Sequence, residues 1–215
     1  MIRPVIIIGA GGHASVVADA LLESGFNVIG FTDRNPRLHG TVLVGLPVLG
    51  EDKRVLAGHR QEEVMLANGL GGVGSNELRQ QVQIEYEEYG WRFATVRHPS
   101  AVVSRRAMMA DSVQLLAGSI VQIGAVVETG VIANTGAVIE HHCEIGRFVH
   151  VAPGALLCGG VKVGSGSHIG AGAVIKQGVR LGPNTLVGAG AVVLKDFEGN
   201  GMLLGAPARL AERMA

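Results

Sequence analysis

The fold is decided by a stretch that reads IEHHCE IGRFVH VAPGAL LCGGVK VGSGSH IGAGAV I from Ile139 to Ile175. An apolar residue opens each group of six, and the same step continues to Val103 in one direction and to Val193 in the other. The sixteen members of this series are Val103, Met109, Leu115, Val121, Val127, Ala133, Ile139, Ile145, Val151, Leu157, Val163, Ile169, Ile175, Leu181, Val187 and Val193. A helix would repeat near 3.6 residues and a single amphipathic strand at 2, so a register of six indicates an internal repeat.

A second phase of the same repeat lies four residues after each apolar position and is small or β-branched. It comprises Ala107, Val113, Ser119, Ala125, Val131, Ala137, Cys143, Val149, Ala155, Val161, Ser167, Ala173, Val179, Thr185 and Ala191. A period of six keeps the alternation of a strand and leaves room for one corner per repeat. Three hexads would form one triangular coil, with both phases pointing into a narrow interior. The pattern predicts an all-β parallel β-helix of about five coils.

Glycine follows the apolar residue directly in five hexads, at Gly146, Gly164, Gly170, Gly182 and Gly188. Glycine tolerates backbone angles that other residues avoid. We therefore expect these glycines to turn the corners of the coils.

Composition and charge narrow the class of protein. Lys+Arg and Asp+Glu both number 18, so no basic field suggests a nucleic-acid partner. The chain has no apolar run long enough to span a membrane and no signal-peptide pattern, so we expect a cytoplasmic protein without membrane contact. The two cysteines, Cys143 and Cys158, match no metal spacing and are expected to be reduced thiols.

The N-terminal segment begins with a buried strand and a glycine turn, PVIIIGAGG at residues 4–12, followed by an amphipathic helix to about residue 24. Gly9, Gly11 and Ala14 fit the pattern G-x-G-x-x-G/A. In that pattern the glycines let the backbone approach a phosphate, and the helix N-terminus offers unpaired N–H groups. Gly12 and His13 lie in the same loop, where His13 could contact phosphate or cap the helix.

Further strands and a helix complete this α/β unit. A second strand at residues 27–32 ends in Asp33 and Arg34, the place where a ribose hydroxyl is usually recognised. A third strand at 64–67 ends in Asn68 and Gly69, and a helix at 76–88 and a strand at 92–96 follow. Only about 95 residues precede the coils, enough for one mononucleotide-binding half. We expect residues 1–97 to form a Rossmann-like nucleotide-binding domain, with a purely structural turn and NAD-type chemistry as alternatives.

The second domain, residues 98–215, holds the β-helix and a C-terminal tail, and four histidines lie in its coils. His141 and His142 follow an inward residue by two and three positions, whereas His150 and His168 precede one, so none is forced into the interior. His150 and His168 are three hexads apart and should stack in one column. His141 and His150 are half a coil apart, so they could share a site only across a subunit boundary. This favours a cyclic oligomer with sites between chains.

The run NTGAVIEHHCEIG from Asn134 to Gly146, followed by His150, resembles the active-site segment of bacterial nucleotide-sugar N-acetyltransferases. This hexapeptide-repeat family includes enzymes that make N-acetylated bacillosamine and perosamine. The glycine loop, the coils and the terminal GAPA at 205–208 extend the resemblance over the whole chain. It implies a left-handed β-helix, a homotrimer with acetyl-CoA between its subunits, and an N-terminal domain that holds the nucleotide of an amino sugar, as in O-antigen and lipopolysaccharide synthesis.

The resemblance also implies roles for individual residues. His141 matches the base beside the sugar amine, His150 a histidine near the thioester, and Gly159-Gly160 a turn whose amide can face the thioester carbonyl. The bacillosamine-type enzyme, which this chain resembles, has an acidic residue where this chain has His142, with Glu140 or Glu144 as alternative carboxylates. The candidates for catalysis are His141 and His142. The candidates for substrate binding are Gly9, Gly11, Gly12, His13, Asp33, Arg34, Asn68, Gly69 and Asn134. The candidates for acetyl-CoA binding are His150, Gly159, Gly160, His168, Gly188, Ala189 and Pro207.

The chemistry expected from these residues is direct acetyl transfer without a metal. An imidazole with a pKa of about 6.5 can accept an amine proton near neutrality, and a backbone N–H can stabilise the oxyanion. Cys143 lies in the inward phase, so an acyl-enzyme is not expected. The predicted acceptor is the 4-amino group of a nucleotide-linked 4-amino-4,6-dideoxy sugar, either GDP-perosamine or a UDP-bacillosamine precursor. The alternatives are a sialic-acid-type O-acetyltransferase, a trimeric carbonic-anhydrase-like metal hydratase and a catalytically silent nucleotide-sugar-binding scaffold.

Overall fold

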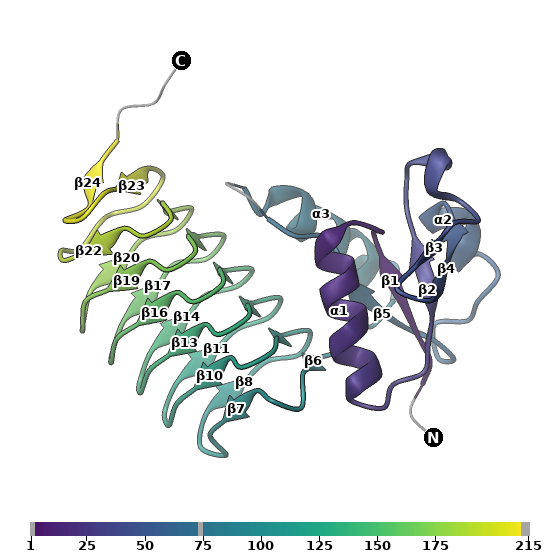
Figure 1. Ribbon diagram of the computed structural model, residues 1–215, viewed down its shortest axis with the longest axis horizontal. Helices are drawn as coiled ribbons and strands as arrows, with labels where there is room; N and C mark the ends of the chain where they lie inside the picture. Colours follow the sequence, from purple (N-terminus) through teal and green to yellow (C-terminus); the bar gives the residue numbers. More distant parts are fainter. Residues whose placement is uncertain (1–2, 73–74, 212–215) are drawn as a thin grey trace. The chain divides into compact units, whose positions relative to one another are not determined.

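The structure is a computed structural model that describes residues 3–72 and 75–211 (Figure 1). The chain divides into two compact units. Unit 1 comprises Met1–Gly71 and Leu78–Pro99, and unit 2 comprises Gly72–Glu77 and Ser100–Ala215. The sequence did not predict that the short segment Gly72–Glu77 would join the second unit.

Unit 1 is an α/β unit built on one sheet with the order β3-β4-β2-β1-β5. The strands are β1 (Val5–Ile8), β2 (Val28–Thr32), β3 (Val42–Leu43), β4 (Leu46–Gly50) and β5 (Met65–Asn68). The helices are α1 (Gly12–Glu23), α2 (Asp52–Leu56) and α3 (Glu77–Glu88), with a 3-10 turn η1 (Pro36–Leu38). All neighbours pair in parallel except β3 with β4. The β3–β4 hairpin and α2 were not predicted, because each is too short to show a period.

The continuous apolar run of β1 is explained by helices on both of its faces. Ile6 and Ile8 pack in one cluster with Leu56 of α2 and Val82 of α3. Ile7 points the other way, and its side chain closes on Gly69 together with Ala14 of α1. A strand covered on both faces reads as an unbroken hydrophobic stretch. The expected strand at 92–96 reduces to one bridge between Phe93 and Leu66, followed by the short strand β6 (Val96–Arg97).

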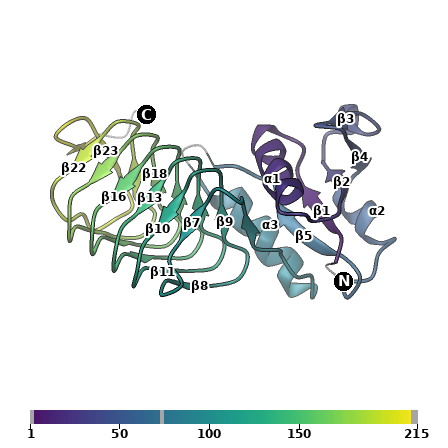
Figure 2. The ribbon, with the colours of Figure 1, turned by 60° about the horizontal axis from the view of Figure 1, so that its bottom comes forward.

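Unit 2 is the left-handed parallel β-helix that the repeat and the resemblance predicted (Figure 2). Each short coil strand pairs in parallel with the strand three hexads further on, as Ile120 does with Val138. One sheet consists of β7 (Val102–Val103), β10 (Ile120–Val121), β13 (Val138–Ile139), β16 (Leu156–Leu157), β19 (Val174–Ile175) and β22 (Val192–Val193). The second consists of β8 (Met108–Met109), β11 (Val126–Val127), β14 (Glu144–Ile145), β17 (Lys162–Val163) and β20 (Arg180–Leu181). The third contains β9 (Gln114–Leu115), β12 (Ile132–Ala133), β15 (His150–Val151), β18 (His168–Ile169), β21 (Leu186–Val187), β23 (Met202–Leu204) and the antiparallel β24 (Arg209–Leu210).

The interior of the coils is formed by the two phases of the hexad. Every apolar-phase residue from Leu115 to Val193 is at most 3% exposed. Val103, Ala107 and Met109 are only partly buried, because they belong to the first coil and lack a preceding coil to pack on. The narrow interior therefore has the Val, Ile, Leu and Ala filling that the sequence indicated.

The glycines that directly follow the apolar residue do not turn the corners, so that expectation was wrong. The left-handed corner residue lies three positions after the apolar residue, as in Gly124 (φ 72°) and Gly160 (φ 68°). Gly146 and Gly170 serve close packing between coils instead. A Cβ on Gly146 would lie 2.8 Å from the backbone nitrogen of Ser165, and one on Gly170 would lie 2.6 Å from that of Ala189.

Candidate active site and nucleotide site

His141 and His142 occupy an exposed corner between β13 and β14. Their Nδ1 atoms are 3.1 Å apart, and the rings meet edge to face with centroids 5.3 Å apart at 79°. His142 has φ 59° at the left-handed corner position, and its backbone N–H donates to the carbonyl oxygen of Ile123 at 3.1 Å. A residue with a side chain is uncommon in this region, and residues held in rare conformations cluster at functional sites.

Two glycines in the neighbouring coils hold the histidine rings. The ring of His141 lies over Gly159, where a Cβ would collide with Nε2 and Cε1, and Gly159 is buried beneath it. The ring of His142 lies over Gly124, where a Cβ would be 2.7 Å from Cδ2. The stacking of every third hexad could have identified both, because Gly159 lies one coil after His141 and Gly124 lies one coil before His142. The sequence reasoning missed Gly124.

The two amides expected at the thioester carbonyl have different surroundings. The N–H of Gly160 donates to the carbonyl oxygen of His141 at 2.8 Å, so it is not available as expected. The N–H of Gly159 has no hydrogen-bond partner within the part of the chain that the structure describes. Of the expected pair, Gly159 therefore has the amide that can still meet an oxyanion.

The carboxylates considered as partners of His141 are engaged elsewhere. Oε2 of Glu140 accepts the backbone N–H of His141 at 3.2 Å, and Oε1 of Glu144 pairs with Nζ of Lys162 at 2.6 Å. The imidazole of His141 instead has His142 beside it. Where the resemblance to the bacillosamine-type enzyme implied an acidic residue, this chain thus has a second imidazole in contact with the first.

His150 and His168 lie in one column, as predicted, with ring centroids 4.9 Å apart at 89°. His150 is only 5% exposed, and both of its ring nitrogens have partners in unit 2. Nδ1 lies 3.0 Å from the carbonyl oxygen of Gly72, and Nε2 lies 3.0 Å from the amide nitrogen of Asn134. Since a carbonyl accepts, Nδ1 carries the proton and Nε2 accepts from Asn134. The roles expected for these residues at the ligands stay predictions.

The segment Gly72–Glu77 is attached to the coils at Gly72 and at Asn76. Asn76 is 3% exposed, and its amide donates to the carbonyl oxygens of Gly166 and Ser167 at 3.2 and 3.0 Å. Together with the bond from His150 to Gly72, these contacts fix both ends of the segment to the coils. No pattern in the sequence indicated them, because the bonded residues are 78 to 91 positions apart.

The thiol of Cys143 is unsuited to nucleophilic catalysis. The residue is fully buried, and burial raises the pKa of the Cys143 thiol to about 11. Its Sγ lies 3.3 Å from the carbonyl oxygen of Cys158. The thiolate is the reactive form of cysteine, and a thiol with this pKa stays protonated at neutral pH.

The remaining candidates for acetyl-CoA binding lie in the last coil and the tail. A Cβ on Gly188 would collide with the side chain of Leu204, so this glycine makes room for the tail. Ala189 and Pro207 are exposed, and Pro207 lies between β23 and β24. The structure does not gather these residues with the His141–His142 pair within one chain.

The glycine loop of unit 1 leads into the N-terminus of α1. Gly11 is the N-cap residue and makes no side-chain cap, and a Cβ on Gly11 or Gly12 would meet nothing within 4 Å. The N–H groups of Gly12 and Ala14 have no partner among the residues described. Free amides at the positive end of a helix are an anion-binding arrangement. His13 lies against Gly71, where a Cβ would be 3.1 Å from the Cβ of His13.

Asp33 supports this loop from the end of β2. Its Oδ2 accepts the N–H of Ala10 at 2.8 Å, and its Oδ1 accepts that of Asn35 at 2.8 Å. The exposed Arg34 has its Nε 3.8 Å from Oδ2 of Asp52. Asp52 is 4% exposed, and the sequence did not identify it because α2 was not predicted. Asp33 thus adjoins the glycine loop through Ala10, whereas the side chain of Arg34 lies near Asp52. Their roles at the ribose and base stay predictions.

Asn68 and Gly69 have structural tasks at the end of β5. Asn68 is 2% exposed, and its amide donates to the carbonyl oxygen of Arg79 at 3.0 Å and accepts from the N–H of Leu70 at 3.1 Å. Gly69 is enclosed, because a Cβ there would be 2.7 Å from Ile7 and 2.8 Å from Ala14. Asn68 is therefore buried, and Gly69 is packed against Ile7 and Ala14. Both residues support the loop that follows β5.

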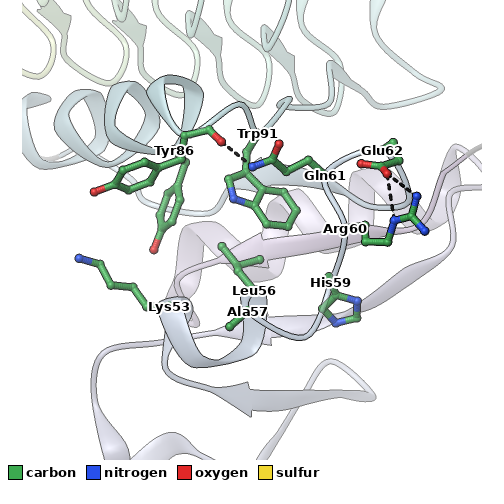
Figure 3. Close-up of a pocket in the computed structure, with 10 residues that line it drawn as sticks. Lys53, Leu56, Ala57, His59, Arg60, Gln61, Glu62, Tyr86 and Trp91 are labelled. Atoms are coloured by element: carbon green, nitrogen blue, oxygen red, sulfur yellow. Dashed lines mark hydrogen bonds and ion pairs between the residues drawn. The ribbon is translucent and has the colours of Figure 1, made fainter.

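A separate open pocket of about 530 Å³ lies on unit 1 and contains none of the predicted site residues (Figure 3). It is lined by Lys53, Leu56, Ala57, His59, Arg60, Gln61, Glu62, Tyr86, Tyr89 and Trp91. Three of its polar side chains already have partners within the pocket lining: Arg60 pairs with Glu62 at 2.6 Å, and the amide of Gln61 donates to the carbonyl oxygen of Tyr89 (Figure 3). We therefore do not assign a ligand to it.

Two features are absent from residues 3–72 and 75–211. Within these ranges no three His, Cys, Asp or Glu side chains of one chain lie close enough together to hold a metal ion. No helix described there is long and apolar enough to cross a membrane.

Comparison with known proteins agrees with the two-part organisation. Residues 4–86 match the family model for the PglD N-terminal domain, and residues 160–195 match that for the bacterial transferase hexapeptide of six repeats. The acetyltransferase domain of PglB from Neisseria gonorrhoeae is 33% identical, with a TM-score of 0.89, and the match covers 97% of this chain and 100% of that one. The same domain has also been solved with acetyl coenzyme A.

A second similar structure is PerB from Caulobacter crescentus, solved with CoA and GDP-perosamine. It is 34% identical, with a TM-score of 0.88, and the match covers 99% of both chains. Variants of that perosamine N-acetyltransferase in which one histidine is replaced by asparagine or alanine have the same fold as this chain, with TM-scores of 0.89. The chain belongs to the hexapeptide-repeat family of sugar N-acetyltransferases that have a PglD-type N-terminal domain.

Proposed function

We propose that this protein transfers the acetyl group of acetyl-CoA to the 4-amino group of a nucleotide-linked 4-amino-4,6-dideoxy sugar, with His141 as the general base. The observation that carries the proposal is the exposed imidazole of His141 beside the N–H of Gly159, which has no hydrogen-bond partner among residues 3–72 and 75–211. One group can take a proton and the other can stabilise an oxyanion. The full-length similarity to sugar N-acetyltransferases supports the choice of reaction.

The proposed reaction is a direct aminolysis of the thioester. The amine nitrogen attacks the carbonyl carbon, the C=O electron pair moves to oxygen, and Nε2 of His141 takes the amine proton. The oxyanion accepts a hydrogen bond from Gly159. Collapse re-forms the carbonyl and breaks the C–S bond, and the imidazolium of His141 returns its proton to the leaving thiolate. The buried, protonated thiol of Cys143 supports a route without an acyl-enzyme.

Unit 1 has the proposed task of binding the nucleotide. The free amides at the N-terminus of α1 would hold its phosphates, and Asp33 and Arg34 would lie near the ribose and base. GDP-perosamine and a UDP-linked bacillosamine precursor are the leading substrates, because the similar structures include both a perosamine enzyme and a PglB domain. We further propose a homotrimer with sites between subunits, acting in the cytoplasm where acetyl-CoA is available.

The test measures thiol release from acetyl-CoA with GDP-, UDP- and dTDP-linked 4-amino sugars, beside a blank without sugar. We expect turnover with one nucleotide class and an N-acetylated product by mass spectrometry. The matched 4-hydroxy sugars serve as controls for the acceptor atom. Release only with hydroxyl acceptors, or with none of the panel, would contradict the proposal.

A further inference from the structure

We infer that His142 is a positioning residue, which accepts a hydrogen bond from Nδ1–H of His141 and so keeps Nε2 of His141 free for the substrate proton. The inference rests on the proposed function of His141. It also assigns a purpose to the residue that departs from the family, where an acidic side chain is expected.

The geometry supports a fixed pair. The two Nδ1 atoms are 3.1 Å apart, and each ring rests on a glycine, His141 on Gly159 and His142 on Gly124. The left-handed backbone of His142 turns its side chain toward that of its chain neighbour. On a regular strand the two side chains would point to opposite faces.

The proton arrangement follows from the chemistry of imidazole. Two neutral rings that meet through Nδ1 share one proton, so one nitrogen donates and the other accepts. If His141 donates, its Nε2 has a free lone pair, which is the form that a general base requires. If both rings became cationic, two N–H groups would face each other at this distance. A hydrogen bond between the two Nδ1 atoms therefore requires that at least one of them carry no hydrogen.

A neutral partner predicts a pH dependence that differs from that of a carboxylate partner. A carboxylate favours the imidazolium and raises the pKa of the base, whereas a neutral imidazole does so much less. Among the ionisable groups next to the pair are Glu140, whose carboxylate accepts the backbone N–H of His141, the buried Cys143, and Cys158, next to Gly159. All the variants below keep Glu140, so any difference between their pH profiles is due to the residue at position 142.

The test compares four proteins: the native chain, His142→Gly, His142→Asn and His142→Asp. Glycine is the commonest residue at this left-handed corner, so His142→Gly removes the acceptor without backbone strain. Asparagine and aspartate also tolerate this conformation and offer an oxygen to Nδ1–H. The readouts are kcat and KM for both substrates from pH 5.5 to 9, and ¹⁵N NMR of histidine-labelled protein to identify the tautomer of His141.

We expect His142→Gly to lower kcat about tenfold or more with little change in either KM, since the base is misoriented while the substrates still bind. His142→Asn should recover most of that loss. His142→Asp should recover it at high pH and shift the acid limb upward by about one pH unit. The Nδ1–H tautomer of His141 should be visible in the native chain and lost in His142→Gly.

The inference is overturned if His142→Gly keeps the native kcat, pH profile and tautomer. It is also overturned if His142→Asn stays as slow as His142→Gly, because the ring rather than an acceptor would then be needed. His141→Ala separates this from a failure of the proposed function. A large loss in His141→Ala with native rates in His142→Gly would remove only the positioning role. Native rates in both variants would show that His141 is not the general base.

Discussion

The imidazole of His141 rests on Gly159, the residue one coil further along the chain, where a single added carbon would collide with the ring. Gly159→Ala should therefore displace the base without disturbing the coil. The same corner position already holds alanine at Ala117 and Ala171, so the backbone accepts that residue. We expect a loss in kcat of about tenfold or more from a displaced base, measured by thiol release, with an unchanged melting temperature.

The matched control for this substitution is Ala171→Gly, the reverse change two hexads later at a corner without a histidine. It should leave kcat unaltered. If Gly159→Ala kept full activity, the packing of the His141 ring on Gly159 would have no part in catalysis.

The N-terminus of α1 gives a test in which stability and binding move in opposite directions. Gly11→Asp would place a carboxylate at the N-cap, which stabilises the helix by about 0.5–1 kcal/mol, and its Cβ has open space. The same charge should repel a bound phosphate, so KM for the sugar nucleotide should rise about tenfold or more with KM for acetyl-CoA unchanged. Gly11→Ser caps the helix without the charge and should bind nucleotide much more tightly than Gly11→Asp. Equal nucleotide affinity in both variants would contradict a phosphate site at this helix.

His150 should contribute to stability through the segment that it holds. Replacing it with alanine leaves the carbonyl oxygen of Gly72 without its donor and removes the ring packed on His168. We expect a loss of about 1–3 kcal/mol in the free energy of unfolding, measured by denaturant titration. Asn76→Ala, which removes the second attachment of the same segment, should destabilise to a similar degree. A native unfolding midpoint in both variants would show that the segment is not held by these contacts.

A structural feature could be predicted from the sequence where its contacts repeat with the hexad. The hexad predicted the inward residues from Leu115 to Val193 and the column of His150 and His168, because stacking repeats with every third hexad. It did not separate the glycines needed for space, such as Gly146, from those needed for backbone angle, such as Gly124. Both kinds recur with the period of six, and the period alone does not say which position of the hexad is the corner.

Contacts that break the period could not be predicted. The contact between the Nδ1 atoms of His141 and His142 lies in a turn, where His142 has a left-handed backbone with φ 59°, and the alternation of a strand does not describe it. The bond from His150 to Gly72 joins residues 78 positions apart and has no local signature. Asn68 was expected at the nucleotide because it ends a strand at the right edge, and this role stays a prediction. The sequence did not indicate that its amide also bonds Arg79 and Leu70 within unit 1.

The thiol of Cys143 offers a test of direct transfer. Burial raises the pKa of Cys143 to about 11, so it should resist alkylation at pH 8 while the half-buried Cys158 reacts. Cys143→Ala should keep kcat within about threefold, and acetyl-CoA alone should leave no acetyl group on the native protein. A mass increase of one acetyl group on Cys143 would contradict this mechanism.

The raised pKa of Cys143 also predicts an alkaline loss of stability. The pKa of a cysteine thiol is ordinarily 9.0, as in the unfolded chain, and burial raises that of Cys143 to about 11 in the folded state. The folded state therefore binds the proton more tightly between these values, so the contribution of Cys143 is complete below pH 9 and declines as the pH rises to about 11. The unfolding free energy of Cys143→Ala should fall less steeply over this range than that of the native chain. Parallel curves for the two proteins would refute the assignment.

The most direct test of the central claim is the turnover of His141→Asn and His141→Ala with the amino sugar that the native chain prefers. If His141 is the general base, kcat should fall by about 10²–10⁴ in both variants while KM for acetyl-CoA stays close to native. A loss of less than about threefold at neutral pH would mean that the amine reacts without this base, and the assignment of His141 would be wrong.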